Sequence, residues 1–87
     1  MTVKEAVVSN KVGLHARSAT YFVQKANEFS SDIRVEVDDC CMNAKSLLGV
    51  LSMGIVQGTS VRLIANGADE KLAVDTLVQV LSGGAEH

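Results

Sequence analysis

Apolar residues in this sequence recur at two different spacings, and the alternation of these spacings constrains the fold more than any other feature. Ile33, Val35 and Val37 alternate with charged residues, and a second period of two runs from Val61 to Ala65. Such alternation predicts strands whose apolar side chains point to one face. Elsewhere the apolar residues are three and four positions apart, as expected for the apolar stripe of an amphipathic helix. This stripe contains Ala16, Ala19, Phe22, Val23, Ala26 and Phe29.

These spacings, with the turn residues between them, predict four strands and three helices in the order βαββαβα. We expect strands at residues 2–8, 33–37, 40–44 and 60–66. A hairpin at Asp38 and Asp39 joins the second and third strands. Helices separated by strands in this order predict an α+β fold, in which an antiparallel sheet is covered by helices on one face.

Each predicted helix has its own start and stop signals. The second helix follows Ser46 as N-cap and ends near Gly54, and the third follows Asp69 as candidate N-cap and stops at the glycines 83 and 84. The inner face of the third helix is expected to hold Leu72, Ala73, Thr76, Leu77 and Val80.

Length and charge narrow the function classes. The 87 residues, with 8 basic and 10 acidic side chains, predict a single domain spanning 1–87. A net charge of −2 and only three aromatic residues argue against direct nucleic-acid binding. Because no apolar run approaches the roughly 20 residues of a membrane span, we expect no membrane insertion and a cytoplasmic location. We further expect a monomer without a cofactor.

The two cysteines, Cys40 and Cys41, are adjacent, and an ordinary disulfide between neighbours is strained. A zinc site would need a second pair of ligands, and His87 at the chain end is the only histidine besides His15. We therefore expect reduced thiols without a functional role and no metal site. A thiol or metal protein built on these cysteines is an alternative without supporting ligands.

The segment at residues 13–20 contains the candidate reactive group. Gly13 allows a tight turn, and His15 falls at the start of the first helix, where free backbone N–H groups and the helix dipole favour anions. A phosphoryl group on the His15 ring is expected to meet the N–H groups of Ala16 and Arg17 and the Arg17 side chain. Because the positive helix end disfavours a second positive charge, we expect His15 to be nucleophilic.

The alternative is a histidine that only caps the helix, with Arg17 as a solvated surface charge. The local pattern alone favours this alternative, because the dipole argument applies to many helices. Ser46 also has two interpretations. It is either an ordinary N-cap, which local chemistry favours, or the target of a regulatory phosphorylation that the helix start tolerates electrostatically.

The helix after Ser46 carries more apolar side chains than one buried stripe requires, namely Leu47, Leu48, Val50 and Leu51. Some of them are expected to be exposed as a docking patch, although core packing is the commoner explanation for any one of them.

Two motifs at matching separation resemble the HPr family, the histidine-containing phosphocarrier proteins of the bacterial sugar phosphotransferase system. They are Gly-Leu-His-Ala-Arg at 13–17 and Asn-Ala-Lys-Ser-Leu-Leu-Gly-Val-Leu-Ser at 43–52. The resemblance covers essentially the whole chain. It implies an open-faced β-sandwich, in which three helices cover a four-stranded antiparallel sheet.

The resemblance also implies functional roles. By this resemblance, His15 would accept a phosphoryl group on Nδ1 from Enzyme I and donate it to IIA domains of sugar permeases, and Arg17 would stabilise the transferring group. Ser46 would be the target of HPr kinase/phosphorylase, as in the low-GC Gram-positive form, and the phosphorylated protein would bind a catabolite-control transcription factor. The candidate partner-binding residues are Thr20, Leu47, Leu48 and Leu51.

The chain departs from the family pattern at two places. Ser18 stands where the family usually has Pro, so we expect a loss of preorganisation in the first helical turn. The hairpin lacks the usual Gly, so an unchanged turn requires a left-handed Asp39. The main alternative function is a regulatory adaptor that acts through Ser46 alone, like family paralogues without the active histidine, and His15 argues against it.

Overall fold

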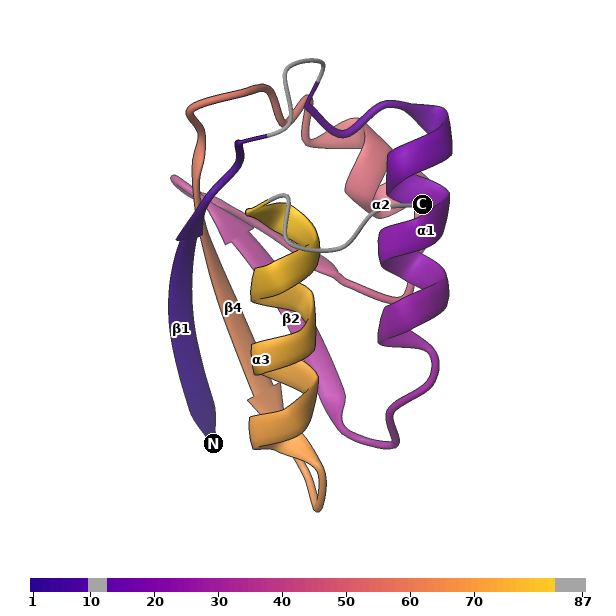
Figure 1. Cartoon of the computed structure of the whole chain (residues 1–87), viewed down its shortest axis with the longest axis vertical. Helices are drawn as coiled ribbons and strands as arrows, with labels where there is room; N and C mark the ends of the chain where they lie inside the picture. The colour runs from indigo at the N-terminus through magenta and orange to yellow at the C-terminus, as the bar shows by residue number, and fades with distance from the viewer. Residues whose placement is uncertain (10–12, 83–87) are drawn as a thin grey trace.

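The computed structural model describes residues 1–9 and 13–82, and it contains the seven predicted elements in the predicted order (Figure 1). The elements are β1 (Thr2–Val7), α1 (Ala16–Ala26), β2 (Asp32–Val37), β3 (Cys40–Asn43), α2 (Leu47–Ser52), β4 (Ser60–Asn66) and α3 (Glu70–Leu81). Helix α1 ends before Phe29, which packs against the core from the following loop. The predicted glycine stop of α3 at 83 and 84 lies outside the described residues.

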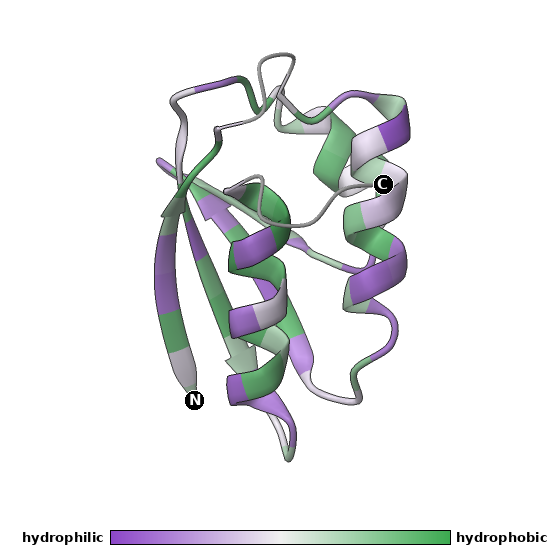
Figure 2. Cartoon of the chain, in the orientation of Figure 1, coloured by the Kyte–Doolittle hydropathy of each residue, from purple (hydrophilic) through white to green (hydrophobic). Residues whose placement is uncertain are grey.

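The four strands form one antiparallel sheet in the order β1-β4-β2-β3. Residues of β4 alternate between buried and accessible, and Val61, Leu63 and Ala65 are the buried ones. Figure 2 shows the same alternation as bands of opposite hydropathy along the strands. One face of the sheet is therefore covered, and the three helices form that cover.

The core lies between this face and the helices. Helix α3 packs on β1 and β4, α2 packs on β3, and α1 packs against both α2 and α3. Phe22 of α1, Ile33 of β2 and Leu77 of α3 have no exposed surface. Each such side chain contributes about 1.5–3 kcal/mol by leaving water, so the core fixes the position of α1 on the sheet.

The structure corrects the predicted inner face of α3. The buried residues of this helix are Ala73, Val74, Leu77 and Leu81, whereas Leu72 is 63% exposed. Apolar residues occur around most of the helix, so the local pattern leaves its rotation open, and packing on the sheet decides it. Asp69 is at the N-cap as predicted, but it makes no capping hydrogen bond.

The hairpin between β2 and β3 is the second correction. The residue with positive φ is Asp38, at 52°, and not Asp39. Aspartate tolerates the left-handed region better than most residues, because its short side chain bonds to nearby backbone. The strands keep a continuous register from Val37 opposite Cys40 to Arg34 opposite Asn43.

Candidate functional site

His15 is the N-cap of α1, as predicted, and its side chain is turned back over the start of the helix. Its Nδ1 accepts a hydrogen bond from the Arg17 backbone N–H at 3.3 Å, and the Ser18 backbone N–H also points to the His15 side chain. Accepting these bonds requires a lone pair on Nδ1, which places the ring proton on Nε2. The exposed ring thus presents a nucleophilic nitrogen at the positive end of an 11-residue helix.

Ser18 has a role that the sequence prediction missed. Its hydroxyl accepts from the His15 backbone N–H at 3.2 Å and donates to the Gly13 carbonyl at 3.1 Å. The bond from the His15 N–H and the contact of the Ser18 N–H with the His15 side chain together form a capping box. These bonds give the turn an order that the sequence prediction did not foresee, while the expected loss of preorganisation relative to proline stays a prediction. The detectable signal was a polar side chain three residues after a potential N-cap.

The loop before His15 is held by the segment that follows α2. The Leu14 N–H donates to the Ile55 carbonyl at 3.0 Å, and Gly13 has a positive φ of 69°. A Cβ on Gly13 would lie 2.5 Å from the Ile55 oxygen and 2.6 Å from the Val56 Cα. Only glycine fits this close approach, so the loop that follows α2 positions the turn before His15.

Arg17 and Thr20 lie on the first turns of α1. Arg17 is exposed, and among residues 1–9 and 13–82 no ion pair holds its guanidinium, which leaves it available to an incoming anion. The Thr20 hydroxyl donates to the Ala16 carbonyl at 2.7 Å. The N–H groups that face the His15 ring are those of Arg17 and Ser18, so the role of Ala16 as a phosphate ligand stays a prediction.

Ser46 is the N-cap of α2, as predicted, and its hydroxyl accepts the Gly49 N–H at 3.1 Å. Leu47 and Leu48 are 37% and 81% exposed, so they form an apolar patch on the surface of α2. Leu51 is only partly exposed and packs against the core, while Val50 is buried. Because α2 packs against α1, the patch and the His15 site belong to neighbouring helices (Figure 1).

The cysteines, a metal site and a membrane span were the other features considered in the sequence. Cys40 and Cys41 are exposed free thiols, and the described part of the chain holds no cluster of three or more residues able to bind a metal. Among the described residues no helix is long and apolar enough to cross a membrane.

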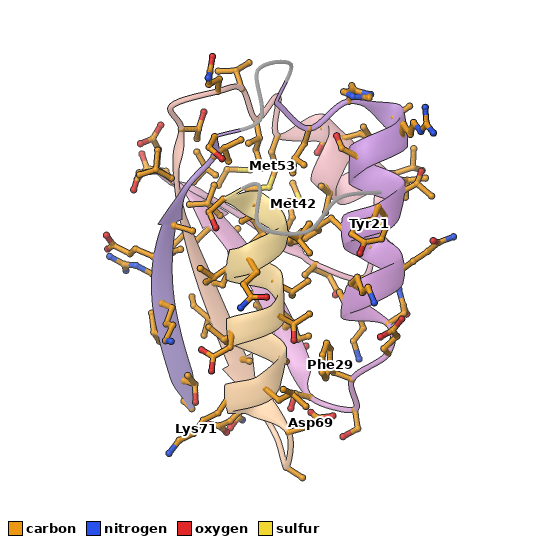
Figure 3. All side chains as sticks on the ribbon, viewed as in Figure 1. Tyr21, Phe29, Met42, Met53, Asp69 and Lys71 are labelled. Carbon is orange, nitrogen blue, oxygen red and sulfur yellow. The ribbon has the colours of Figure 1, made fainter. Side chains whose placement is uncertain are left out.

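The strongest electrostatic perturbations occur at the start of α3. Hydrogen bonds from the Ser31 hydroxyl and the Ser30 N–H lower the pKa of Asp69 to about 2. Bonds from the Thr2 hydroxyl and the N-terminal amine lower the pKa of Glu70 to about 2. Figure 3 shows Asp69 and Met53 at opposite ends of the molecule. Since Met53 directly follows α2, these carboxylates stabilise the fold far from that helix.

Comparison with known proteins decides the family. A family model described as "PTS HPr component phosphorylation site" matches residues 2–82. The chain belongs to the HPr family. It is 44% identical to an HPr-like protein Crh from Halalkalibacterium halodurans over 78 residues, which cover 90% of this chain and 93% of that one.

Solved HPr structures agree with this assignment. A structure of HPr from Thermoanaerobacter tengcongensis, in the form HPr-C-His, superposes with a TM-score of 0.92 at 45% identity and covers 100% of both chains. A second structure from that organism is an HPr dimer, with a TM-score of 0.75 at 46% identity over 99% of this chain and 97% of that one. The HPr phosphocarrier fold, with its four-stranded antiparallel sheet and three helices, is therefore the fold of this chain.

Proposed function

We propose that this chain is a stoichiometric phosphocarrier of the sugar phosphotransferase system. His15 accepts a phosphoryl group from Enzyme I and passes it to IIA domains of sugar permeases. The protein acts in the cytoplasm, as a monomer and without a cofactor, and has no turnover of its own. The observation that carries the proposal is the position of the exposed residue His15 at the start of α1, where its Nδ1 is held as a hydrogen-bond acceptor.

The site geometry supports an exchange of phosphoryl groups. The Nδ1 lone pair forms the new bond to phosphorus, while the bond from phosphorus to the donor breaks and the donor keeps its electron pair. Once Nδ1 is bonded to phosphorus, it no longer accepts from the backbone, and the N–H groups of Arg17 and Ser18 are free to bind phosphoryl oxygens. The exposed Arg17 guanidinium supplies the balancing charge. Return transfer to an acceptor reverses these steps.

Incubation with Enzyme I and phosphoenolpyruvate tests the proposal directly. Mass spectrometry should show one acid-labile phosphoryl group on the parent protein and none on His15→Ala. Because the His15 ring is exposed, the variant should keep the circular dichroism spectrum of the parent. Normal phosphorylation of His15→Ala would refute the assignment of the acceptor.

Regulation at Ser46 is a second part of the proposal. HPr kinase/phosphorylase would phosphorylate this exposed N-cap, and the phosphorylated protein would bind a catabolite-control transcription factor through the Leu47 and Leu48 patch. Support comes from the exposure of all three side chains and from the position of Ser46 at the positive end of α2.

Ser46→Asp tests this regulation through Enzyme I. The added negative charge should leave α2 folded and weaken the encounter with Enzyme I, and high salt should reduce the difference. The measurement is steady-state transfer at low and high salt, with Ser46→Asn as an uncharged control that still caps the helix. Equal kinetics for the two variants at both salt concentrations would contradict an electrostatic switch.

The alternative is a regulatory adaptor that works through Ser46 alone. This alternative is supported by the similarity of the chain to a relative that is named HPr-like protein Crh. The adaptor would bind its partner after Ser46 phosphorylation and would remain unphosphorylated by Enzyme I, so the mass-spectrometry experiment separates the two functions.

A further inference from the structure

Ser18 is a buried polar residue that contacts His15 in two ways. Only 2% of its surface is exposed, and its hydroxyl joins the His15 N–H to the Gly13 carbonyl. Its own backbone N–H points to the His15 side chain. One residue therefore restrains both the backbone of the N-cap and the orientation of its ring.

We infer that Ser18 is a positioning residue for phosphoryl transfer at Nδ1 of His15, an inference that rests on the proposed phosphocarrier function. The hydroxyl holds the His15 backbone extended, with φ −101° and ψ −176°, at the point where the helix begins. This conformation keeps Nδ1 in front of the N–H groups of Arg17 and Ser18. After transfer, the same two N–H groups meet the phosphoryl oxygens.

A proline at this position would have a different effect on the site. Proline fixes φ but has neither an N–H nor a hydroxyl. A chain with Pro at residue 18 thus offers the ring of His15 one N–H group fewer than this chain does. Ser18 therefore replaces the stiffness of proline by two hydrogen bonds and adds one donor to the phosphoryl site.

Two substitutions separate these contributions. Ser18→Ala removes the hydroxyl and keeps the backbone N–H, whereas Ser18→Pro removes both. Ser82→Ala is the matched control, because Ser82 is an exposed serine at the end of α3 whose hydroxyl only donates to the Val78 carbonyl. Circular dichroism establishes that each variant is folded at the temperature of measurement.

The first readout is the imidazole ¹⁵N spectrum of the unphosphorylated protein, in which loss of signals in His15→Ala identifies those of His15. We expect the Nε2–H tautomer in the parent and in Ser82→Ala. Ser18→Ala should show an increased share of Nδ1–H, and Ser18→Pro a larger one. Parent-like spectra for both Ser18 variants would overturn the inference. If Ser18→Pro does not fold, Ser18→Ala against Ser82→Ala decides.

The second readout is the lifetime of the phosphorylated form, made with the small donor phosphoramidate and followed at His15 by tandem mass spectrometry. Loss of one backbone donor should make Ser18→Pro lose its phosphoryl group about threefold to tenfold faster than the parent. An equal lifetime in Ser18→Pro and the parent would refute the claim that the Ser18 N–H binds the phosphoryl group. If the parent takes phosphoryl from phosphoramidate but not from Enzyme I, the proposed function fails, while both readouts still decide the role of Ser18.

Discussion

Gly13→Ala is the substitution for which the structure predicts the largest local effect near His15. Alanine at a φ of 69° costs about 1–2 kcal/mol, because Cβ approaches its own backbone. The added Cβ would also meet the Ile55 oxygen at 2.5 Å and the Val56 Cα at 2.6 Å. Both are backbone atoms, so no side-chain rotation relieves the contact.

The loss of stability can be estimated from the contacts that change when the added Cβ pushes residue 13 away from Ile55 and Val56. Overpacking of this kind costs about 1–3 kcal/mol, and separating the two segments puts at risk the Leu14 hydrogen bond to Ile55, worth about 0.5–1.5 kcal/mol. We expect Gly13→Ala to lower the free energy of unfolding by about 3–5 kcal/mol. A chain of this length has a total of roughly 4–13 kcal/mol, so the expected loss is between about a quarter of the stability and all of it.

Urea denaturation followed by circular dichroism measures the effect, and Gly54→Ala is the control. Gly54 has a φ of 61°, but a Cβ there meets nothing within 4 Å. The control therefore contains the conformational cost without the steric contact, and should lose only about 1–2 kcal/mol. If the two variants are equally stable, the close approach of Gly13 to the Ile55 backbone does not restrict residue 13, and our account of how the site is held is wrong.

Three further predictions concern the guanidinium, the carboxylate and the thiols. Arg17→Ala should raise the activation free energy of phosphoryl transfer by about 1.5–3 kcal/mol, because one charge-assisted hydrogen bond is lost, and should leave the melting temperature unchanged. Rapid-quench kinetics measure the transfer rate, and an unchanged rate would remove Arg17 from the mechanism. Folding lowers the pKa of Asp69 from 3.8 to about 2, so the ionised carboxylate stabilises the fold above pH 4, and this stability is lost as the pH falls from 4 to 2. Asp69→Asn should therefore be less stable than the parent at neutral pH, and it should lose less stability than the parent between pH 4 and pH 2. If the urea midpoints of the variant and the parent fall in parallel over this range, the prediction is wrong. Replacing Cys40 and Cys41 with Ser should leave transfer within a few-fold of the parent, since both thiols are exposed and distant along the chain from His15; a tenfold loss would contradict it.

The sequence alone was sufficient for features whose causes are local. Alternation of apolar residues predicted the inward face of β4, and the spacing of three and four predicted α1. The N-cap positions of His15 and Ser46 followed from residues within the next helical turn. In each case the pattern that carries the prediction repeats within four residues, because the backbone geometry of a helix or strand fixes which nearby side chains share a face.

Only the tertiary structure decided the features that depend on distant segments. The approach of Gly13 to Ile55 and the bonds from Ser31 to Asp69 join residues far apart in the chain, so no local pattern indicated them. The rotation of α3, which buries Val74 and exposes Leu72, depended on packing against β1 and β4. The sequence thus determined that His15 begins a helix, and tertiary packing decided how the loop in front of that helix is held, because steric fit between two backbones exists only after the chain has folded.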